Sequence, residues 1–180
     1  MYTLLLVDDE EDVIEVIERK VSWEQIGFHV VGHAGNGFKT LEMMEDMQPD
    51  VVMTDIRMPY MDGLELCSNI RQRFPATKLL LFTGFDDFEY AKEAVHLEIE
   101  EYILKPLNLA EITEVFKKLK TKLDDELNEK KNTDILKKHY VASLPVLQSN
   151  FYTTLIEGRI PENELGRYMR DYQIELEGPY

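Results

Sequence analysis

Asp-Val-Val-Met-Thr-Asp-Ile-Arg-Met-Pro-Tyr-Met-Asp-Gly, residues 50–63, is the stretch around which the chain is organised. Its apolar run, residues 51–53, is long enough for a buried strand and too short for a helix. The run ends at a carboxylate, Asp55, and a turn with Pro59 and Gly63 follows. We therefore expect Asp55 to lie where a strand leaves the core. In open parallel α/β sheets, ligands bind at that edge.

Apolar runs alternate with helical patterns over the first 120 residues or so. The predicted strands are residues 3–7, 28–31, 51–54, 78–82 and 101–104. The predicted helices are residues 11–21, 37–47, 63–74 and 87–97, and a long helix after Asn108. Such alternation with short connections is typical of a parallel sheet with helices on both faces. The predicted fold class is α/β, a doubly wound, flavodoxin-like, five-stranded parallel sheet of order 2-1-3-4-5, followed by a helical linker region.

Local signals place several helix ends. Asp62, Asp86 and Asn108 are expected to cap the helices that follow them. The pattern at residues 22–25, Ser-Trp-Glu-Gln, is typical of a capping box that opens a short helical turn, with Gly27 closing the turn. Gly32 is expected in the loop after the second strand.

The long helix begins with a 3-4 alternation of apolar residues at positions 109, 112, 116, 119 and 123. This spacing fits either packing of the helix on the sheet or the seam of a dimer, and the sequence leaves both open. Lys and Glu dominate residues 117–138, which predicts a solvated helix between two pieces. Apolar residues return in 141–180, where Gly158 is expected to end a helix and Pro161 to be the first residue of another.

Composition excludes some functions. The chain has 35 acidic and 20 basic residues and a net charge of −15. Such a chain repels nucleic-acid phosphates, so any DNA-binding part is expected outside it. Cys67 is the only cysteine, which excludes an internal disulfide and fits a reducing compartment. The sequence shows neither a signal peptide nor a membrane span, so we expect a cytoplasmic protein that does not bind a membrane.

The predicted strand order brings polar side chains from distant parts of the sequence to one edge of the sheet. They are Asp8, Asp9, Asp55, Thr83 and Lys105. Clustered carboxylates repel one another unless they share a cation. Mg²⁺ prefers oxygen ligands and binds through one or two carboxylates together with phosphate oxygens. With an ammonium and a hydroxyl nearby, the site suits a phosphoryl group, and the central Asp55 is the expected nucleophile.

Four blocks carry a resemblance to a known family. They are Leu-Leu-Val-Asp-Asp-Glu (5–10), Thr-Asp-Ile-Arg-Met-Pro-Tyr-Met-Asp-Gly (54–63), Thr83-Gly84 and Tyr-Ile-Leu-Lys-Pro (102–106). In this order and spacing, residues 1 to about 122 resemble the receiver domain of two-component response regulators. The resemblance implies a switch rather than an enzyme, with at most self-catalysed phosphotransfer and dephosphorylation. It also implies a sensor histidine kinase as partner and a homodimer.

The resemblance also implies roles for individual residues. Asp55 is the phosphoacceptor, Asp9 is a direct Mg²⁺ ligand next to Asp8, and the backbone carbonyl of Arg57 is a further ligand. The resemblance makes Lys105 the lysine that contacts the phosphoryl group. It makes Thr83 the switch hydroxyl and Tyr102 the switch aromatic.

Residues 86–91, Asp-Asp-Phe-Glu-Tyr-Ala, and residues 140–180 resemble more narrowly regulators with an AraC-type helix-turn-helix output domain. We therefore expect a receiver domain at 1–122 and a helical linker or dimerisation region at 123–180. The chain is expected to be truncated before a DNA-binding output domain. DNA would then be bound only through that domain.

Two other functions fit part of the pattern. An Asp-nucleophile phosphatase uses the same kind of edge and metal, but usually needs an acid two residues after the nucleophile, where this chain has Arg57. A receiver fold that serves only for dimerisation would not need Asp55, Thr83 and Lys105 together.

Overall fold

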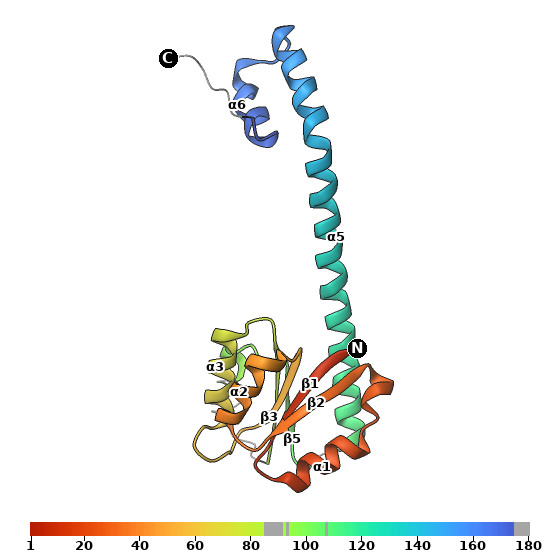
Figure 1. Cartoon of the computed structure of the whole chain (residues 1–180), viewed down its shortest axis with the longest axis vertical. Coiled ribbons are helices and arrows are strands. Elements are labelled where there is room, and N and C mark those ends of the chain that lie inside the picture. The colour runs from red at the N-terminus through yellow and green to blue at the C-terminus, as the bar shows by residue number, and fades with distance from the viewer. Residues whose placement is uncertain (85–91, 93, 107, 175–180) are drawn as a thin grey trace. The chain divides into compact units, whose positions relative to one another are not determined.

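The structure, a computed structural model, describes residues 1–84, 92, 94–106 and 108–174 and divides into two compact units, Met1–Asp124 and Asp125–Tyr180. The first unit contains a five-stranded parallel sheet (Figure 1). Its strands are β1 (Tyr2–Val7), β2 (Phe28–Ala34), β3 (Val51–Asp55), β4 (Lys78–Thr83) and β5 (Glu101–Leu104). Their order is β2-β1-β3-β4-β5, which confirms the predicted fold class.

Helices cover both faces of this sheet. They are α1 (Glu11–Lys20), the short 3₁₀ helix η1 (Trp23–Ile26), α2 (Gly37–Met47), α3 (Gly63–Arg73) and the first turns of α5 (Leu109–Ile156). Helices α1 and α5 pack on one face of the sheet, and α2 and α3 pack on the other (Figure 1). The predicted cap Asp86 and most of the helix after it lie outside the described residues. None of the helices described is long and apolar enough to cross a membrane.

Side-chain caps begin two helices as predicted. The Asp62 carboxylate accepts a hydrogen bond from the Glu65 N–H at 2.8 Å, and Asn108 accepts one from the Ala110 N–H at 3.0 Å. The predicted capping box at residues 22–25 is wrong, because the Ser22 side chain makes no capping bond. A backbone bond from the Gln25 N–H to the Ser22 carbonyl closes the 3₁₀ turn instead.

Gly32 lies inside β2 and not in a loop, so that prediction is wrong. The strand continues to Ala34 because the pairing register shifts between Leu4 and Leu5, which leaves one extra residue in β2 at a bulge. A β-carbon at Gly32 would come within 2.8 Å of the Met43 side chain of α2. A larger side chain there would have to displace the flexible end of Met43.

Three aromatic rings anchor α5 on the sheet. The Phe116 ring lies edge-on to Trp23, with centroids 4.8 Å apart, and edge-on to Phe28, with centroids 5.0 Å apart. The neighbouring residues Ile112 and Leu119 are buried in the same cluster. Of the two interpretations of the 3-4 alternation, the structure therefore shows packing on the sheet.

Polar contacts hold the same helix at its exit from the first unit. Glu100, just before β5, pairs with Lys78 at 3.4 Å and with Lys122 of α5 at 2.6 Å. Burial would raise the Glu100 pKa, but the two ammonium groups outweigh it and hold that pKa below its ordinary value. The Tyr2 hydroxyl donates to Asp124 at 2.8 Å. These bonds tie α5 to β1 and to the segment before β5.

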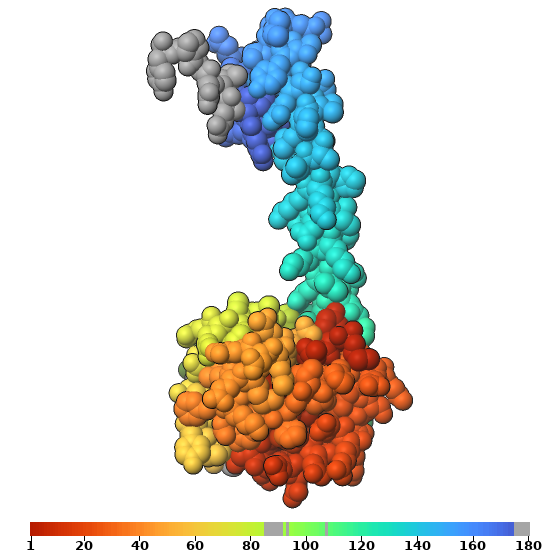
Figure 2. All heavy atoms as spheres, viewed as in Figure 1, coloured from red at the N-terminus to blue at the C-terminus, as the bar shows by residue number. Residues whose placement is uncertain are grey.

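The second unit contains the rest of α5 and α6 (Glu162–Asp171). All residues from 125 to 143 are exposed, and Figure 2 shows their side chains projecting from a single helix. Further along, α5 buries Leu144 and Phe151, and the Phe151 ring meets Tyr172 at a centroid distance of 6.3 Å. Gly158 follows α5 with a φ of +66°, as a helix-ending glycine does, but Pro161 is the N-cap of α6 and not its first residue.

We expect Phe116→Ala to destabilise the first unit by about 3–5 kcal/mol, because it removes a fully buried ring between two others. Trp23 is the only tryptophan, so its fluorescence during urea unfolding reports on this unit alone. Phe38→Ala, at a ring 57% exposed on α2, is the matched control and should change stability by less than about 0.5 kcal/mol. An equal decrease in the free energy of unfolding in both variants would show that Phe116 does not anchor α5.

Candidate functional site

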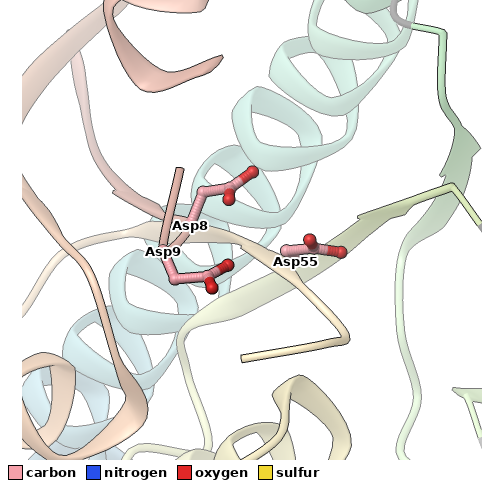
Figure 3. Close-up of side chains that lie close together, drawn as sticks. All are labelled: Asp8, Asp9 and Asp55. Atoms are coloured by element: carbon pink, nitrogen blue, oxygen red, sulfur yellow. The ribbon is translucent and has the colours of Figure 1, made fainter. Parts of the chain in front are cut away.

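Three carboxylates meet at the carboxyl edge of the sheet. Asp8 and Asp9 follow β1, and Asp55 ends β3. These strands are neighbours, with Val7 paired to Thr54, so the carboxylates of the two strands lie side by side (Figure 3). Ligand oxygens of the three residues lie within 4.8 Å of one another, with Asp8 and Asp55 buried and Asp9 exposed. The cluster suits a hard divalent cation that is reached from solvent on the Asp9 side.

Lys105 supplies a positive charge to the same edge. It follows β5, and its ammonium lies 3.0 Å from an Asp8 oxygen and 2.9 Å from an Asp55 oxygen. The ammonium also lies 4.9 Å from the centre of the Phe82 ring. The fold thus joins residues that are 97 and 50 positions apart in the sequence.

The charges at this edge do not balance. Burial raises the Asp8 pKa above its ordinary value, although a hydrogen bond from the Glu10 N–H and the Lys105 ammonium both act to lower it. Burial acts against the Lys105 charge, but the bonds to Asp55 and Asp8 outweigh it and raise the Lys105 pKa. Among the described residues, one ammonium therefore faces three carboxylates, and a further cation would relieve their repulsion.

Backbone packing fixes the position of Asp55. The Ile56 N–H donates to the Asp55 carboxylate at 2.7 Å, and the Gly63 N–H donates to the Ile56 carbonyl at 2.7 Å. A β-carbon at Gly63 would lie 2.0 Å from the Asp55 carbonyl oxygen. Any other residue at position 63 would thus displace the backbone of Asp55. The sequence indicated a turn at Gly63 but not this contact, because the contact depends on how α3 packs.

The structure brings Thr83 and Tyr102 close to the same edge. Thr83 is buried at the end of β4, next to Phe82, which pairs with Asp55. Thr83 pairs with Leu104 of β5, so Tyr102, two residues earlier, shares its face of the sheet. Tyr102 is half-buried there. Arg57 is exposed two residues beyond β3, and the role of its backbone carbonyl stays a prediction.

The raised Asp8 pKa predicts how the charge of this carboxyl affects the stability of the metal-free protein. A raised pKa in the folded state means that folding disfavours the ionised carboxylate, so this group lowers the free energy of unfolding once the pH exceeds its unfolded pKa. The neutral variant Asp8→Asn should therefore be more stable than the wild type at pH 7.5. We expect a gain of about 0.5–2 kcal/mol in urea unfolding with EDTA, shrinking as the pH falls toward 4. Asp46→Asn, at an exposed position of α2, is the control for the loss of one charge. Destabilisation of Asp8→Asn at pH 7.5 would show that the Lys105 pairing outweighs the burial.

Comparison with known proteins gives one consistent result. Residues 4–117 match the sequence model of the response regulator receiver domain. The chain is 36% identical to the uncharacterized transcriptional regulatory protein YesN of Bacillus subtilis, over 76% of this chain and 37% of that protein. It is 25% identical to the transcriptional regulatory protein HptR of Staphylococcus aureus, over 91% of this chain and 64% of that protein.

A solved structure agrees with this result. The receiver domain of AraT, a response regulator from Geobacillus stearothermophilus, is 36% identical with a TM-score of 0.66, over 70% of this chain and 98% of that one. The chain spans 37% to 64% of the length of the curated relatives named above. The matched region holds the sheet and the carboxylate cluster. This chain belongs to the response regulator receiver family of two-component systems.

Proposed function

We propose that Asp55 accepts a phosphoryl group from a sensor histidine kinase in a Mg²⁺-dependent reaction, which switches the receiver and controls a transcriptional output domain. The observation that carries this proposal is the geometry of the carboxylates, whose ligand oxygens lie within 4.8 Å of one another, with the Lys105 ammonium at 2.9 Å from Asp55. Receiver domains generally bind Mg²⁺ at an acidic pocket of this kind.

In the proposed reaction, a carboxylate oxygen of Asp55 attacks the phosphorus of a phosphohistidine. The phosphorus–nitrogen bond breaks, and the histidine leaves with its electron pair and takes up a proton. The carboxylate is held for this attack by the Ile56 N–H, which bonds one of its oxygens and leaves the other toward Lys105. Positioning and charge stabilisation supply most of the catalysis in phosphoryl transfer.

Asp9, with Asp8 beside it, would hold the cation together with Asp55 and the Arg57 carbonyl. A bound Mg²⁺ would neutralise charge that develops on the phosphoryl oxygens. Asp9 is the exposed member of the cluster, so the ion can keep several waters, as Mg²⁺ prefers. Lys105 already contacts the Asp55 oxygen and would transfer its bond to the new phosphate.

The switch would follow from the same contacts. The new phosphate carries about −1.5 to −2 charges at neutral pH and would draw the Thr83 hydroxyl and Lys105 inward. Tyr102 lies on the same face of the sheet as Thr83, so it could turn into the space that Thr83 leaves. A coupling of about 1–3 kcal/mol is enough for such a change in population.

The phosphatase alternative receives no support at the site. The residue two positions after Asp55 is the exposed Arg57, which cannot act as a general acid at neutral pH. The named relatives are transcriptional regulators, and this chain spans only part of their length. We therefore propose residues 1–122 as the receiver and 123–180 as a linker or dimerisation region before a DNA-binding output domain, in a cytoplasmic protein.

Phosphoryl incorporation tests the nucleophile. Incubation with phosphoramidate and Mg²⁺ should add one hydroxylamine-labile phosphoryl group to the wild type, and EDTA should prevent it. Asp55→Asn should lose all labelling with its fold intact. Asp62→Asn is the matched control, since asparagine also caps α3, and should be labelled normally. Stable labelling of Asp55→Asn at another residue would refute the assignment.

Mass in solution tests whether phosphorylation drives assembly. The edge strand β5 carries Leu104, 41% exposed, which a second copy could cover. With Mg²⁺ and beryllofluoride, a phosphoryl mimic, we expect light scattering to show doubling of the mass in the wild type. Asp55→Asn should stay a monomer. A dimer both with and without the mimic would instead assign assembly to regions that do not respond to Asp55.

A further inference from the structure

The loop between β3 and α3 holds a non-glycine residue in a strained conformation. Tyr60 has a φ of +73°, in the left-handed region that favours glycine. The Met61 N–H donates to the Pro59 carbonyl at 3.0 Å, which makes Tyr60 the central residue of a three-residue turn. A γ-turn with positive φ at its centre is the rare and strained form.

The rest of the loop is held firmly on both sides of Tyr60. Met58 and Met61 are only 8% and 6% exposed and belong to the core under α2 and α3. Met61 packs so closely on the first turn of α2 that a β-carbon at Gly37 would lie 2.6 Å from its sulfur. The two methionines therefore fix the turn and hold the Tyr60 side chain outward.

The Tyr60 ring gives the fold little in return for this strain, since it is 88% exposed. Glycine at this position would adopt the same φ without cost and would expose no ring. Strained residues that contribute little to packing occur where a binding or catalytic site requires them. Tyrosine is also enriched among the residues that dominate protein–protein binding energy.

The position of the loop indicates which molecule the ring would meet. The loop starts directly after Asp55, and Gly63, the first residue of α3 after the loop, packs against the Asp55 backbone. The Asp55 side chain is only 8% exposed. A protein must bring its phosphohistidine to within about 3–3.5 Å of the nucleophile, so its surface must cover the rim of the site. A small phosphodonor can enter without covering that rim.

We propose that Tyr60 is a docking residue for the phosphodonor protein, whose surface packs on the exposed ring while its phosphohistidine reaches Asp55. This inference rests on the proposed function of Asp55. The ring acts on binding of the protein donor and takes no part in the chemistry. Loss of the ring should therefore slow phosphoryl transfer from a protein donor and leave transfer from a small-molecule donor unchanged.

The test compares two donors on the full chain. One is phosphoramidate, and the other is the sensor kinase that labels the wild type fastest when the purified kinases of the same genome are autophosphorylated and screened. Tyr60→Gly should lower the transfer rate from the kinase by about tenfold, the effect of losing a binding hot spot. Its labelling by phosphoramidate should match the wild type. Tyr60→Phe should restore transfer from the kinase.

Controls separate docking from damage to the fold. Tyr60→Gly should have a higher urea midpoint than the wild type, because it relieves strain at the turn. Phe38→Ala removes an exposed ring from α2 and should leave both transfer rates unchanged. Equal slowing of Tyr60→Gly with both donors would overturn the inference, because the ring would then act through the geometry of Asp55.

Other outcomes also decide the question. An unchanged kinase rate in Tyr60→Gly would overturn the docking role. Loss of the beryllofluoride-dependent mass change in Tyr60→Gly, with kinase transfer intact, would assign the ring to contact with a second copy instead. Labelling of the wild type by phosphoramidate but by no kinase would contradict a protein donor. No labelling by either donor would refute the proposed function itself.

Discussion

The ammonium of Lys105 between two buried carboxylates is the interaction on which the organisation of the first unit depends. It lies 3.0 Å from Asp8 and 2.9 Å from Asp55, which are 97 and 50 positions away in sequence. Without it, two buried carboxylates would face each other with no fixed countercharge, which is strongly destabilising. The contact forms only if the ends of β1, β3 and β5 reach one edge, so the electrostatics of the site and the strand order depend on each other. The remaining excess of negative charge leaves the site ready for a cation.

Strand β5 connects this site to a polar contact with α5. Lys105 follows the strand, and Glu100, which precedes it, is bonded to Lys122 of α5 at 2.6 Å. The strand has four residues, so a displacement of Lys105 has little chain in which to be absorbed. On its other side, α5 is fixed by the Phe116 ring. The helix is thus held by an apolar contact at Phe116 and by a polar contact at Lys122.

Sequence patterns predicted the fold well, because each central strand is a continuous apolar run and the caps Asp62 and Asn108 act locally. The convergence of Asp8, Asp55 and Lys105 also followed from strand order alone. What failed or was missed depends on tertiary packing. Gly32 sits in β2 because the strand continues to pair with β1 beyond a bulge, which overrides the turn preference of glycine. The contact of Gly63 with the Asp55 backbone and the positive φ of Tyr60 have no local signal, since both arise from how α2 and α3 confine one loop.

The positions of the apolar residues along α5 limit how two copies of the chain could associate. The apolar alternation up to Leu123 is used by the sheet, so it is not available as a dimer seam. Continued with the same 3-4 spacing, the seam positions would be Glu126, Lys130, Thr133 and Lys137, all exposed. Identical lysines facing each other in a parallel pair would repel, and charges at seam positions lower the stability of a coiled coil. A simple coiled coil through the charged middle of α5 is therefore disfavoured. Association would have to use the receiver surface or the apolar residues that return after position 140, and only the receiver surface contains the phosphoacceptor.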